Sequence, residues 1–146
     1  MQIGQIMSKE VITVNMDTSL ETISRIFNEK RFHHVLVVWN DKLIGVISDR
    51  DLFKALSPFL NTMSEQTRDL NTLKKKAHQI MSRDLITITK EEILEDAVKL
   101  LLIHSISCLP VISPEGQIQG IVTWRDILFA YAYRYKFAHS DIIGEL

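Results

Sequence analysis

The sequence predicts an α+β fold in which two copies of one β-α-β-β-α unit pack together in a pseudo-two-fold arrangement. The first observation is an internal repeat: shifted by 74 residues, Ile6–Thr13 lies on Ile80–Thr87 with five identities in eight positions. The second is that, after one inserted residue, GVISDRDL (Gly45–Leu52) lies on GIVTWRDI (Gly120–Ile127), with Gly, Arg and Asp identical. A repeat of this length is a supersecondary unit that cannot bury its apolar face alone, so the two copies should pack on each other.

Each copy shows the same order of elements. A short β-branched run is followed by a stretch with apolar residues at helical spacing, two β-prone runs joined by a turn, and a final helix. In the first copy the elements are Val11–Val14, Ser19–Lys30, His34–Trp39, Leu43–Ser48 and a helix that begins at Asp49. In the second copy they are Leu85–Ile88, Glu92–His104, Cys108–Ile112, Gln117–Thr123 and a helix that begins at Trp124.

These boundaries divide the chain into two repeats and two other segments. The first repeat is expected at residues 1–56, a connecting segment at 57–77, the second repeat at 78–135 and a C-terminal tail at 136–146. The connecting segment is polar and contains no glycine, so it is expected to form a short helix that leads into the second repeat rather than a flexible linker.

Composition argues against several classes of protein. Lys and Arg number 17 against 18 Asp and Glu, and this balance argues against a nucleic-acid binder, which would carry a basic excess. The longest run without charge, Leu100–Pro114, contains His104 and three serines and is too short and polar to span a membrane. The first ten residues lack the pattern of a signal peptide. We therefore expect a soluble, cytoplasmic protein.

Motifs for catalysis and metal binding are missing from the sequence. The single cysteine, Cys108, excludes an internal disulfide and a thiolate-only metal cage, and its apolar strand predicts that it is buried. The adjacent His33 and His34 would point to opposite faces of a strand and could not share one metal ion. No P-loop, Rossmann or GxSxG motif occurs. Neither a catalytic cofactor nor a metal site is expected, and the protein is not predicted to be an enzyme.

At the repeated heptapeptides the chain resembles the CBS-domain family, whose paired repeats form a Bateman module. The motif G-h-h-[ST]-x-x-D, where h is an apolar residue, stands here as GVISDRD (Gly45–Asp51) and GIVTWRD (Gly120–Asp126). The segments IMSKEVITV, IMSRDLITI and LPVIS support the resemblance, which covers about Gln5–Tyr135. Within the family, the chain resembles the small standalone CBS-pair proteins of bacteria. It implies a regulatory sensor that binds AMP, ADP or ATP in the cleft between the repeats and signals to a partner protein by conformational change. S-adenosylmethionine and NAD are further candidate ligands.

The resemblance implies roles for three residues of each motif. They are Ser48, Arg50 and Asp51 in the first repeat and Thr123, Arg125 and Asp126 in the second. A carboxylate in the first turn of a helix is stabilised by the helix dipole and can accept hydrogen bonds from both ribose hydroxyls. The hydroxyl residue stands where backbone N–H groups face a phosphate, and the arginine offers a planar fork to phosphate oxygens. The alternative is that the motif is an ordinary helix start followed by an ordinary surface Arg-Asp pair.

The family geometry also implies that each site is shared, because the first strand of one repeat covers the base held by the motif of the other. This groups Lys9 and Val11 with Thr123, Arg125 and Asp126, and Arg83 and Leu85 with Ser48, Arg50 and Asp51. Lys9 and Arg83 would add positive charge, unless both are simply solvated. The position that is often basic in nucleotide-binding relatives holds His34 in the first repeat and Cys108 in the second. We therefore expect the site with Asp51 to suit several phosphates, and the other to be weaker, to take adenosine-like ligands, or to stay empty.

A homodimer is expected, because the amphipathic helices leave more apolar surface than one pair of repeats can cover. The last helix carries a stripe of Trp124, Leu128, Tyr131 and Tyr135, which is either a dimer face or part of the core. Two other functions stay open: a ligand-free scaffold for protein interaction, and an enzyme acting on nucleotides, which the missing catalytic groups disfavour. The partner protein and the physiological nucleotide are not determined by the sequence.

Overall fold

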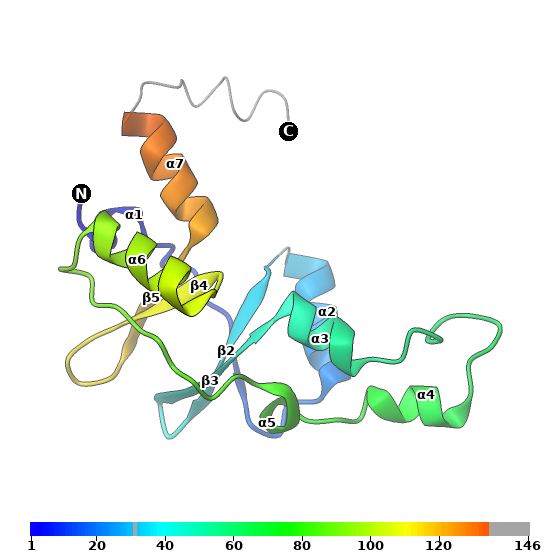
Figure 1. Ribbon diagram of the computed structural model, residues 1–146. Helices are drawn as coiled ribbons and strands as arrows, with labels where there is room; N and C mark the ends of the chain where they lie inside the picture. The colour runs from blue at the N-terminus through cyan, green and yellow to red at the C-terminus, as the bar shows by residue number, and fades with distance from the viewer. Residues whose placement is uncertain (31, 135–146) are drawn as a thin grey trace. The chain divides into compact units, whose positions relative to one another are not determined.

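The computed structural model describes residues 1–30 and 32–134, and the chain divides into two compact units (Figure 1). Unit 1 consists of Met1–Glu10 together with Ile86–Leu146, and unit 2 consists of Val11–Leu85. The N-terminal segment of the first repeat therefore folds with the second repeat, and the residues that open the second repeat fold with the first. The predicted tail at 136–146 lies outside the described residues.

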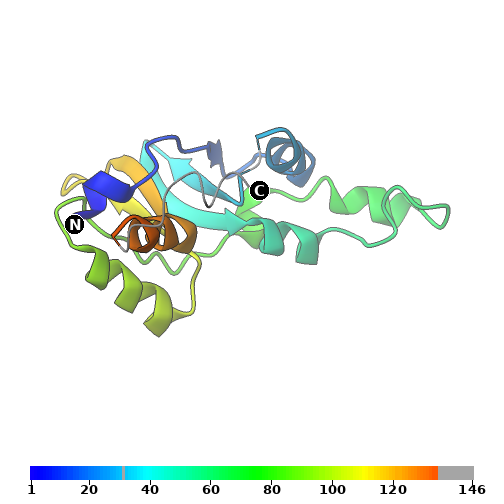
Figure 2. The ribbon, with the colours of Figure 1, turned by 90° about the horizontal axis from the view of Figure 1, so that it is seen from above.

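Unit 2 holds a three-stranded sheet and four helices within its described residues. Its elements are β1 (Thr13–Asn15), α2 (Leu20–Lys30), β2 (His34–Trp39), β3 (Lys42–Ser48), α3 (Asp49–Ala55), α4 (Thr67–Thr72) and α5 (Ala77–Ile80). The numbering of its helices starts at α2 because α1 belongs to unit 1. Strand β1 pairs parallel with β2, which pairs antiparallel with β3. The hairpin turns at Asn40 and Asp41, both at positive φ, as a two-residue type I′ turn requires. Helix α4 lies away from the sheet of its unit, in the connecting segment (Figure 2).

Unit 1 repeats the helix, hairpin and following helix of unit 2 with a smaller sheet. It contains α1 (Ile3–Ile6), α6 (Leu94–His104), β4 (Cys108–Ile112), β5 (Ile118–Thr123) and α7 (Trp124–Arg134). Strands β4 and β5 pair antiparallel. The strand predicted at Leu85–Ile88 is wrong, because only Ile88 pairs there, through one parallel bridge to Val111. A single bridged residue does not form the consecutive ladder that β1 forms with β2.

The other predicted elements are confirmed to within about two residues. Strands β2 and β4 have the predicted bounds, and α3 and α7 begin at the predicted residues. The connecting segment contains α4 and leads into α5, as its composition indicated. The sequence did not predict α1, because one helical turn is too short to show a periodicity. For α5 the sequence predicted only a short helix leading into the second repeat, without its bounds.

Each unit has its own hydrophobic core. In unit 2 the apolar face of α2 packs on the sheet, and in unit 1 the apolar face of α6 does the same. We call the segments of α1 and α5 the exchanged segments, because each folds with the other repeat. They contribute to the two cores: Ile3 of α1 is fully buried in unit 1, and Ala77 of α5 is fully buried in unit 2. Burial of this kind explains why each short helix belongs to the unit that the neighbouring repeat builds. Among the described residues no helix is long and apolar enough to cross a bilayer.

Candidate functional site

The serine and aspartate of the first motif cap helix α3 reciprocally. The backbone N–H of Asp51 donates to Ser48 Oγ at 3.1 Å, and the backbone N–H of Ser48 donates to Asp51 Oδ2 at 2.9 Å. This is a capping box, which satisfies two backbone donors at the start of the helix. Oxygen Oδ1 of Asp51 accepts no hydrogen bond from the residues that the structure describes. The helix-start interpretation therefore accounts for one carboxylate oxygen and leaves the other for a ligand.

The second motif repeats this geometry at the start of α7. The backbone N–H of Thr123 donates to Asp126 Oδ2 at 2.7 Å, and Thr123 Oγ1 donates to the same oxygen at 3.0 Å. The backbone N–H of Asp126 lies 3.4 Å from Thr123 Oγ1. Within the described chain, Oδ1 of Asp126 likewise accepts no hydrogen bond. Both aspartates are half-buried, so each carboxylate is held in place while one oxygen stays available.

The motif glycines admit the exchanged segments at close range. A Cβ placed on Gly45 would lie 2.8 Å from Met81 Cγ, and one placed on Gly120 would lie 2.6 Å from the carbonyl oxygen of Ser8. In unit 2 the backbone of Ser82 exchanges hydrogen bonds of 2.9 and 3.1 Å with Val46. In unit 1, Ser8 and Ile121 make the same exchange at 2.9 Å in both directions. The repeated glycine is thus explained by packing next to the motif.

His34 begins β2 and lies opposite Ser48 in the β2–β3 register, so it belongs with the Asp51 motif. Burial lowers the pKa of His34, while Asp49 and Asp51 oppose this shift and His33 adds to it. The imidazole is therefore mainly neutral at pH 7 in the ligand-free protein. At the corresponding position of unit 1 stands Cys108, which is buried as predicted.

The two motif arginines are exposed and differ in their surroundings. No described contact engages the Arg50 side chain, whereas the guanidinium carbon of Arg125 lies 5.6 Å from the centre of the Phe129 ring. This distance is that of a cation–π contact, which orients Arg125 along α7.

The structure does not bring all the predicted site residues together. Arg83 donates from Nη2 to the carbonyl oxygen of His78 at 3.1 Å instead of contacting the Asp51 motif, and Leu85 is half-buried in the same unit. Lys9 is exposed in unit 1, which also holds the Asp126 motif. Val11 was grouped with that motif but belongs to unit 2. The structure therefore assembles the motif residues with His34, while the flanking basic residues lie outside these contacts.

Asp126 lines a groove between α1 and α7 in unit 1, with a volume of about 570 Å³. The other lining residues are Met1, Gln5, Ile6, Phe129, Ala130 and Tyr133. A volume of this size is within the range of small-molecule sites, and aromatic walls with a few polar groups are typical of them. The sequence did not indicate the α1 residues, because they come close to Asp126 only when the N-terminal segment joins the second repeat.

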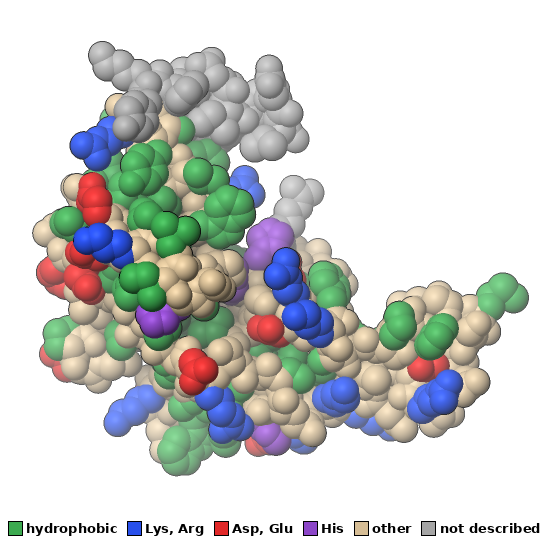
Figure 3. Space-filling view, viewed as in Figure 1, with side chains coloured by type: hydrophobic (Ala, Val, Ile, Leu, Met, Phe, Trp, Pro, Cys, Tyr) green, Lys and Arg blue, Asp and Glu red, His purple; other side chains and the backbone are tan. Residues whose placement is uncertain are grey.

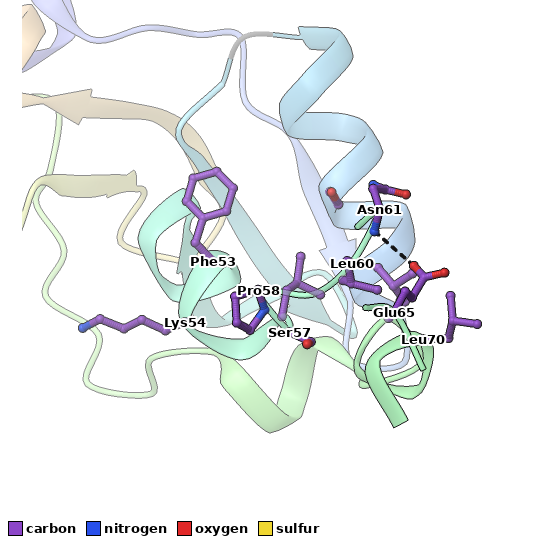
Figure 4. Close-up of a pocket in the computed structure, with 11 residues that line it drawn as sticks. Phe53, Lys54, Ser57, Pro58, Leu60, Asn61, Glu65 and Leu70 are labelled. Carbon is purple, nitrogen blue, oxygen red and sulfur yellow. Dashed lines mark hydrogen bonds between the residues drawn. The ribbon is translucent and has the colours of Figure 1, made fainter. Parts of the chain in front are cut away.

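A second pocket, of about 540 Å³, lies in unit 2 between α2, α3 and the connecting segment (Figure 4). Its walls are mostly apolar, and the backbone N–H of Asn61 donates to Glu65 Oε1 at 3.1 Å across one end. The connecting segment is held by the buried Asp69, which accepts hydrogen bonds from Ser57 and Gln66 at 2.7 Å. These hydrogen bonds lower the pKa of Asp69. None of the predicted site residues lines this pocket.

Hydrophobic side chains are also exposed on α7 (Figure 3). Trp124 and Leu128 are 58% and 55% exposed, whereas Tyr131 of the predicted stripe packs against the core of unit 1. Tyr135 lies outside the described residues. The described part of the chain contains no group of three His, Cys, Asp or Glu side chains placed to hold a metal ion.

Comparisons with known proteins agree with this architecture. A CBS domain-containing protein of Dictyostelium discoideum is 36% identical over 128 residues, which cover 86% of this chain and 88% of that protein. An uncharacterized protein of Methanocaldococcus jannaschii is 33% identical over 127 residues, which cover 87% of this chain but 38% of that longer protein. The crystallised CBS domain pair of protein MJ0100, in complex with 5′-methylthioadenosine and S-adenosyl-L-methionine, is 26% identical. It matches with a TM-score of 0.76 over 92% of this chain and 98% of that one.

The sequence profile of the CBS domain matches twice, at residues 3–58 and 77–133. These matches contain both capping motifs and both exchanged helical segments. The chain therefore belongs to the CBS domain family and carries two CBS repeats.

Proposed function

We propose that this protein is a regulatory module that binds adenosine nucleotides at its two motif carboxylates and signals to a partner protein by a change of conformation. One observation carries the proposal: Asp51 and Asp126 are both fixed by a capping box through Oδ2 and both keep Oδ1 available. A fixed carboxylate oxygen at a helix start is well suited to accept hydrogen bonds from ribose hydroxyls. The duplication of this geometry supports binding over a cap that serves the helix alone.

The choice of an adenosine compound is supported by a relative. The CBS domain pair of protein MJ0100 was crystallised with two compounds that contain adenosine, 5′-methylthioadenosine and S-adenosyl-L-methionine. At 26% identity this supports the same ligand class for the present chain but does not select one nucleotide. The motif residues supply hydrogen bonds and charge rather than a nucleophile, so we assign them to binding and not to catalysis.

The decisive experiment is a calorimetric titration of AMP, ADP and ATP into the wild type, D51N, D126N and the double variant. Asparagine is preferred to alanine because its amide oxygen can still accept the capping N–H and thus preserve the helix start. Loss of a charged acceptor should cost about 1.5–3 kcal/mol, roughly 10- to 150-fold in affinity. We expect D51N to weaken the site for polyphosphates, and D126N to weaken the other site.

Asp96→Asn is the matched control. Asp96 also caps a helix from the third helical position, with Oδ2 3.3 Å from the backbone nitrogen of Ile93, but it lies outside both motifs. The control should bind adenosine nucleotides like the wild type. Unchanged binding in the double variant would contradict the proposal and favour the ligand-free scaffold. So would a melting temperature that no adenosine compound raises, because a ligand specific for the native state stabilises it by mass action.

We further propose a homodimer that uses the exposed side of α7. Trp124 and Leu128 are one helical turn apart and more than half exposed, which supports a contact with a second copy. Light scattering should give twice the chain mass of 16.8 kDa at micromolar concentration. W124D should shift the mass toward the monomer, whereas a monomeric wild type would contradict this part of the proposal.

A further inference from the structure

The connecting segment is fastened to the end of α3 by hydrogen bonds, and the pocket of unit 2 lies between them (Figure 4). Lys75 donates from Nζ to the carbonyl oxygen of Ala55 at 3.2 Å, and the backbone N–H of Ser57 donates to Thr72 Oγ1 at 3.2 Å. Ser57 Oγ also donates to the buried Asp69 at 2.7 Å. The pocket, of about 540 Å³, is therefore part of the folded architecture of unit 2.

The apolar walls of this pocket reach the surface. Phe53 of α3 and Leu70 of α4 are both exposed, and so is Phe59, which lies in the chain between two lining residues. The half-buried part of the apolar lining consists of Leu56, Leu60 and Leu73. Because the apolar surface extends beyond the cavity, it suits an occupant that covers the rim as well as filling the pocket, such as a segment of another protein.

This part of the chain is basic, although the whole chain is slightly acidic. Residues 53–76 hold five Lys and Arg against two Asp and Glu, whereas the whole chain holds 17 against 18. Lys54, Arg68 and Lys74 are exposed and form no salt bridge with the residues that the structure describes. Lys and Arg side chains lie beside hydrophobic ones over this surface (Figure 3). The complement of such a surface is an apolar segment flanked by carboxylates.

Helix α3 joins this surface to the first motif. Asp51 in its first turn belongs to the motif, and Phe53 and Lys54 of the same helix line the pocket. The helix has seven residues and is therefore about 10 Å long. A displacement of α3 at the motif would reach the pocket through one secondary-structure element, and this places the pocket where a partner could sense such a change.

We propose that the pocket of unit 2 is the docking site for a partner protein, which contributes an acidic amphipathic segment. Its apolar side chains would enter the pocket, and its carboxylates would meet Lys54, Arg68 and Lys74. The existence of a regulated partner rests on the proposed function, whereas the chemistry of the docking segment rests on the lining and the charges of unit 2. A protein segment is favoured over a membrane surface, because protruding side chains fill a cavity and a flat surface does not.

Two fluorescently labelled synthetic peptides of about 14 residues test this inference, both with leucine on one helical face. One carries glutamate on the other face and the second carries lysine. Fluorescence anisotropy with the full chain should show that the acidic peptide binds about tenfold or more tightly than the basic one. Leu70→Gln should weaken binding of the acidic peptide about tenfold, and the double change Lys54→Glu and Lys74→Glu about fivefold or more.

Each change has a matched control. Met63→Gln removes an exposed apolar side chain of the same connecting segment that does not line the pocket. Lys42→Glu reverses an exposed charge on β3 of the same unit. Both controls should bind the acidic peptide like the wild type. Should circular dichroism show that Leu70→Gln has lost helix, Phe53→Gln alters the α3 wall instead and should also weaken binding.

Several outcomes would overturn the inference. The acidic peptide could bind no more tightly than the basic one, or Leu70→Gln could leave its binding unchanged. Lys42→Glu could weaken binding as much as Lys54→Glu, which would show an attraction of charge without a site. Light scattering could show that Leu70→Gln lowers the mass, which would mean that a second copy fills the pocket. Phosphatidylglycerol vesicles could bind the wild type when the acidic peptide does not, which would indicate a membrane surface.

Nucleotide titrations of the same variants separate this inference from the proposed function. Leu70→Gln should bind adenosine nucleotides like the wild type, because Leu70 lies outside both motifs. If the wild type binds no adenosine nucleotide and the acidic peptide still binds at Leu70, the proposed nucleotide function fails. The docking site then stands as that of a ligand-free scaffold.

Discussion

Helices α3 and α7 begin with the same capping box and differ at the residue that follows the capping hydroxyl. In unit 2 this residue is Asp49, whose Oδ2 lies 2.8 Å from Nδ1 of His33. In unit 1 it is Trp124, which is 58% exposed. The residues that cap the helix are thus kept in both copies, whereas the residue after the capping hydroxyl has diverged. The comparison indicates that the repeats share a scaffold but present different surfaces.

The same contrast extends to the positions around each motif. The start of β2 carries the titratable His34, and the start of β4 carries the buried Cys108. The helix that follows the motif carries Lys54 in unit 2 and Phe129 in unit 1. Unit 2 thus has an imidazole and an ammonium group at two positions where unit 1 has a buried thiol and an aromatic ring. This difference is the physical basis for expecting different ligands at the two motifs.

The largest expected effect concerns the motif glycines. A methyl group at Gly120 meets the backbone oxygen of Ser8, which cannot move without breaking the hydrogen bonds to Ile121. At Gly45 it meets only the flexible Met81 side chain. We expect Gly120→Ala to lower the free energy of unfolding by about 3 kcal/mol and Gly45→Ala by about 1 kcal/mol. Urea denaturation measures both values. If the two variants lost equal free energy of unfolding, the Ser8 backbone would be no more rigid an obstacle than the Met81 side chain, and this prediction would be wrong.

The next effect concerns pH and distinguishes His34 from Cys108. Because burial lowers the pKa of His34 below 6.5, the unfolded chain takes up a proton more readily than the folded one. Above pH 6.5 His34 is neutral in both states, and the free energy of unfolding has its full value. As the pH falls from 6.5 toward the lowered pKa, the free energy of unfolding decreases by at most about 1.4 kcal/mol per pH unit. Denaturation between pH 8 and 5 should show this loss in the wild type. H34C, which installs the residue of the second repeat, should lose less stability over the same range, and an identical slope would contradict the assignment.

The two caps should respond alike. Ser48→Ala and Thr123→Ala each remove a hydroxyl that accepts a backbone N–H at the start of its helix, at 3.1 and 3.4 Å. Each change should lower the free energy of unfolding by about 1 kcal/mol. Thermal denaturation of the two variants side by side checks this. A difference of more than about 1 kcal/mol would show that the two helix starts are not energetically equivalent.

The smallest effect is expected for the contact between His33 and Asp49, whose positions hold Ser107 and Trp124 in unit 1. The side chains of His33 and Asp49 are 67% and 36% exposed, so solvent screens their attraction. We expect His33→Gln to change the free energy of unfolding by less than about 1 kcal/mol. Urea denaturation at low and high salt measures it. A loss well above this value would mean that the pair helps to hold the start of α3, and that the repeats differ in their scaffold as well as their surfaces.

The sequence by itself determined most of the elements and their order, with the exceptions of α1 and of the strand wrongly predicted at Leu85–Ile88. Apolar residues at helical spacing located α2 and α6, and β-prone runs on either side of a turn located β2 to β5, because such patterns depend on neighbours a few residues away. The capping residues Ser48 and Thr123 were also readable, since a cap and its partner lie three residues apart. The family followed from the repeated motif, whose glycine, hydroxyl and aspartate are local features.

Only the tertiary structure decided which segments fold together. Ile3 and Ala77 are buried in the unit of the neighbouring repeat, and no local pattern reveals a partner so far along the chain. The same packing brings Met1 into the groove with Asp126, directs Tyr131 into the core of unit 1, and leaves the Arg83 guanidinium on the carbonyl of His78. The physical reason is that burial and long-range contact depend on the whole fold, whereas capping and periodicity are set by adjacent residues.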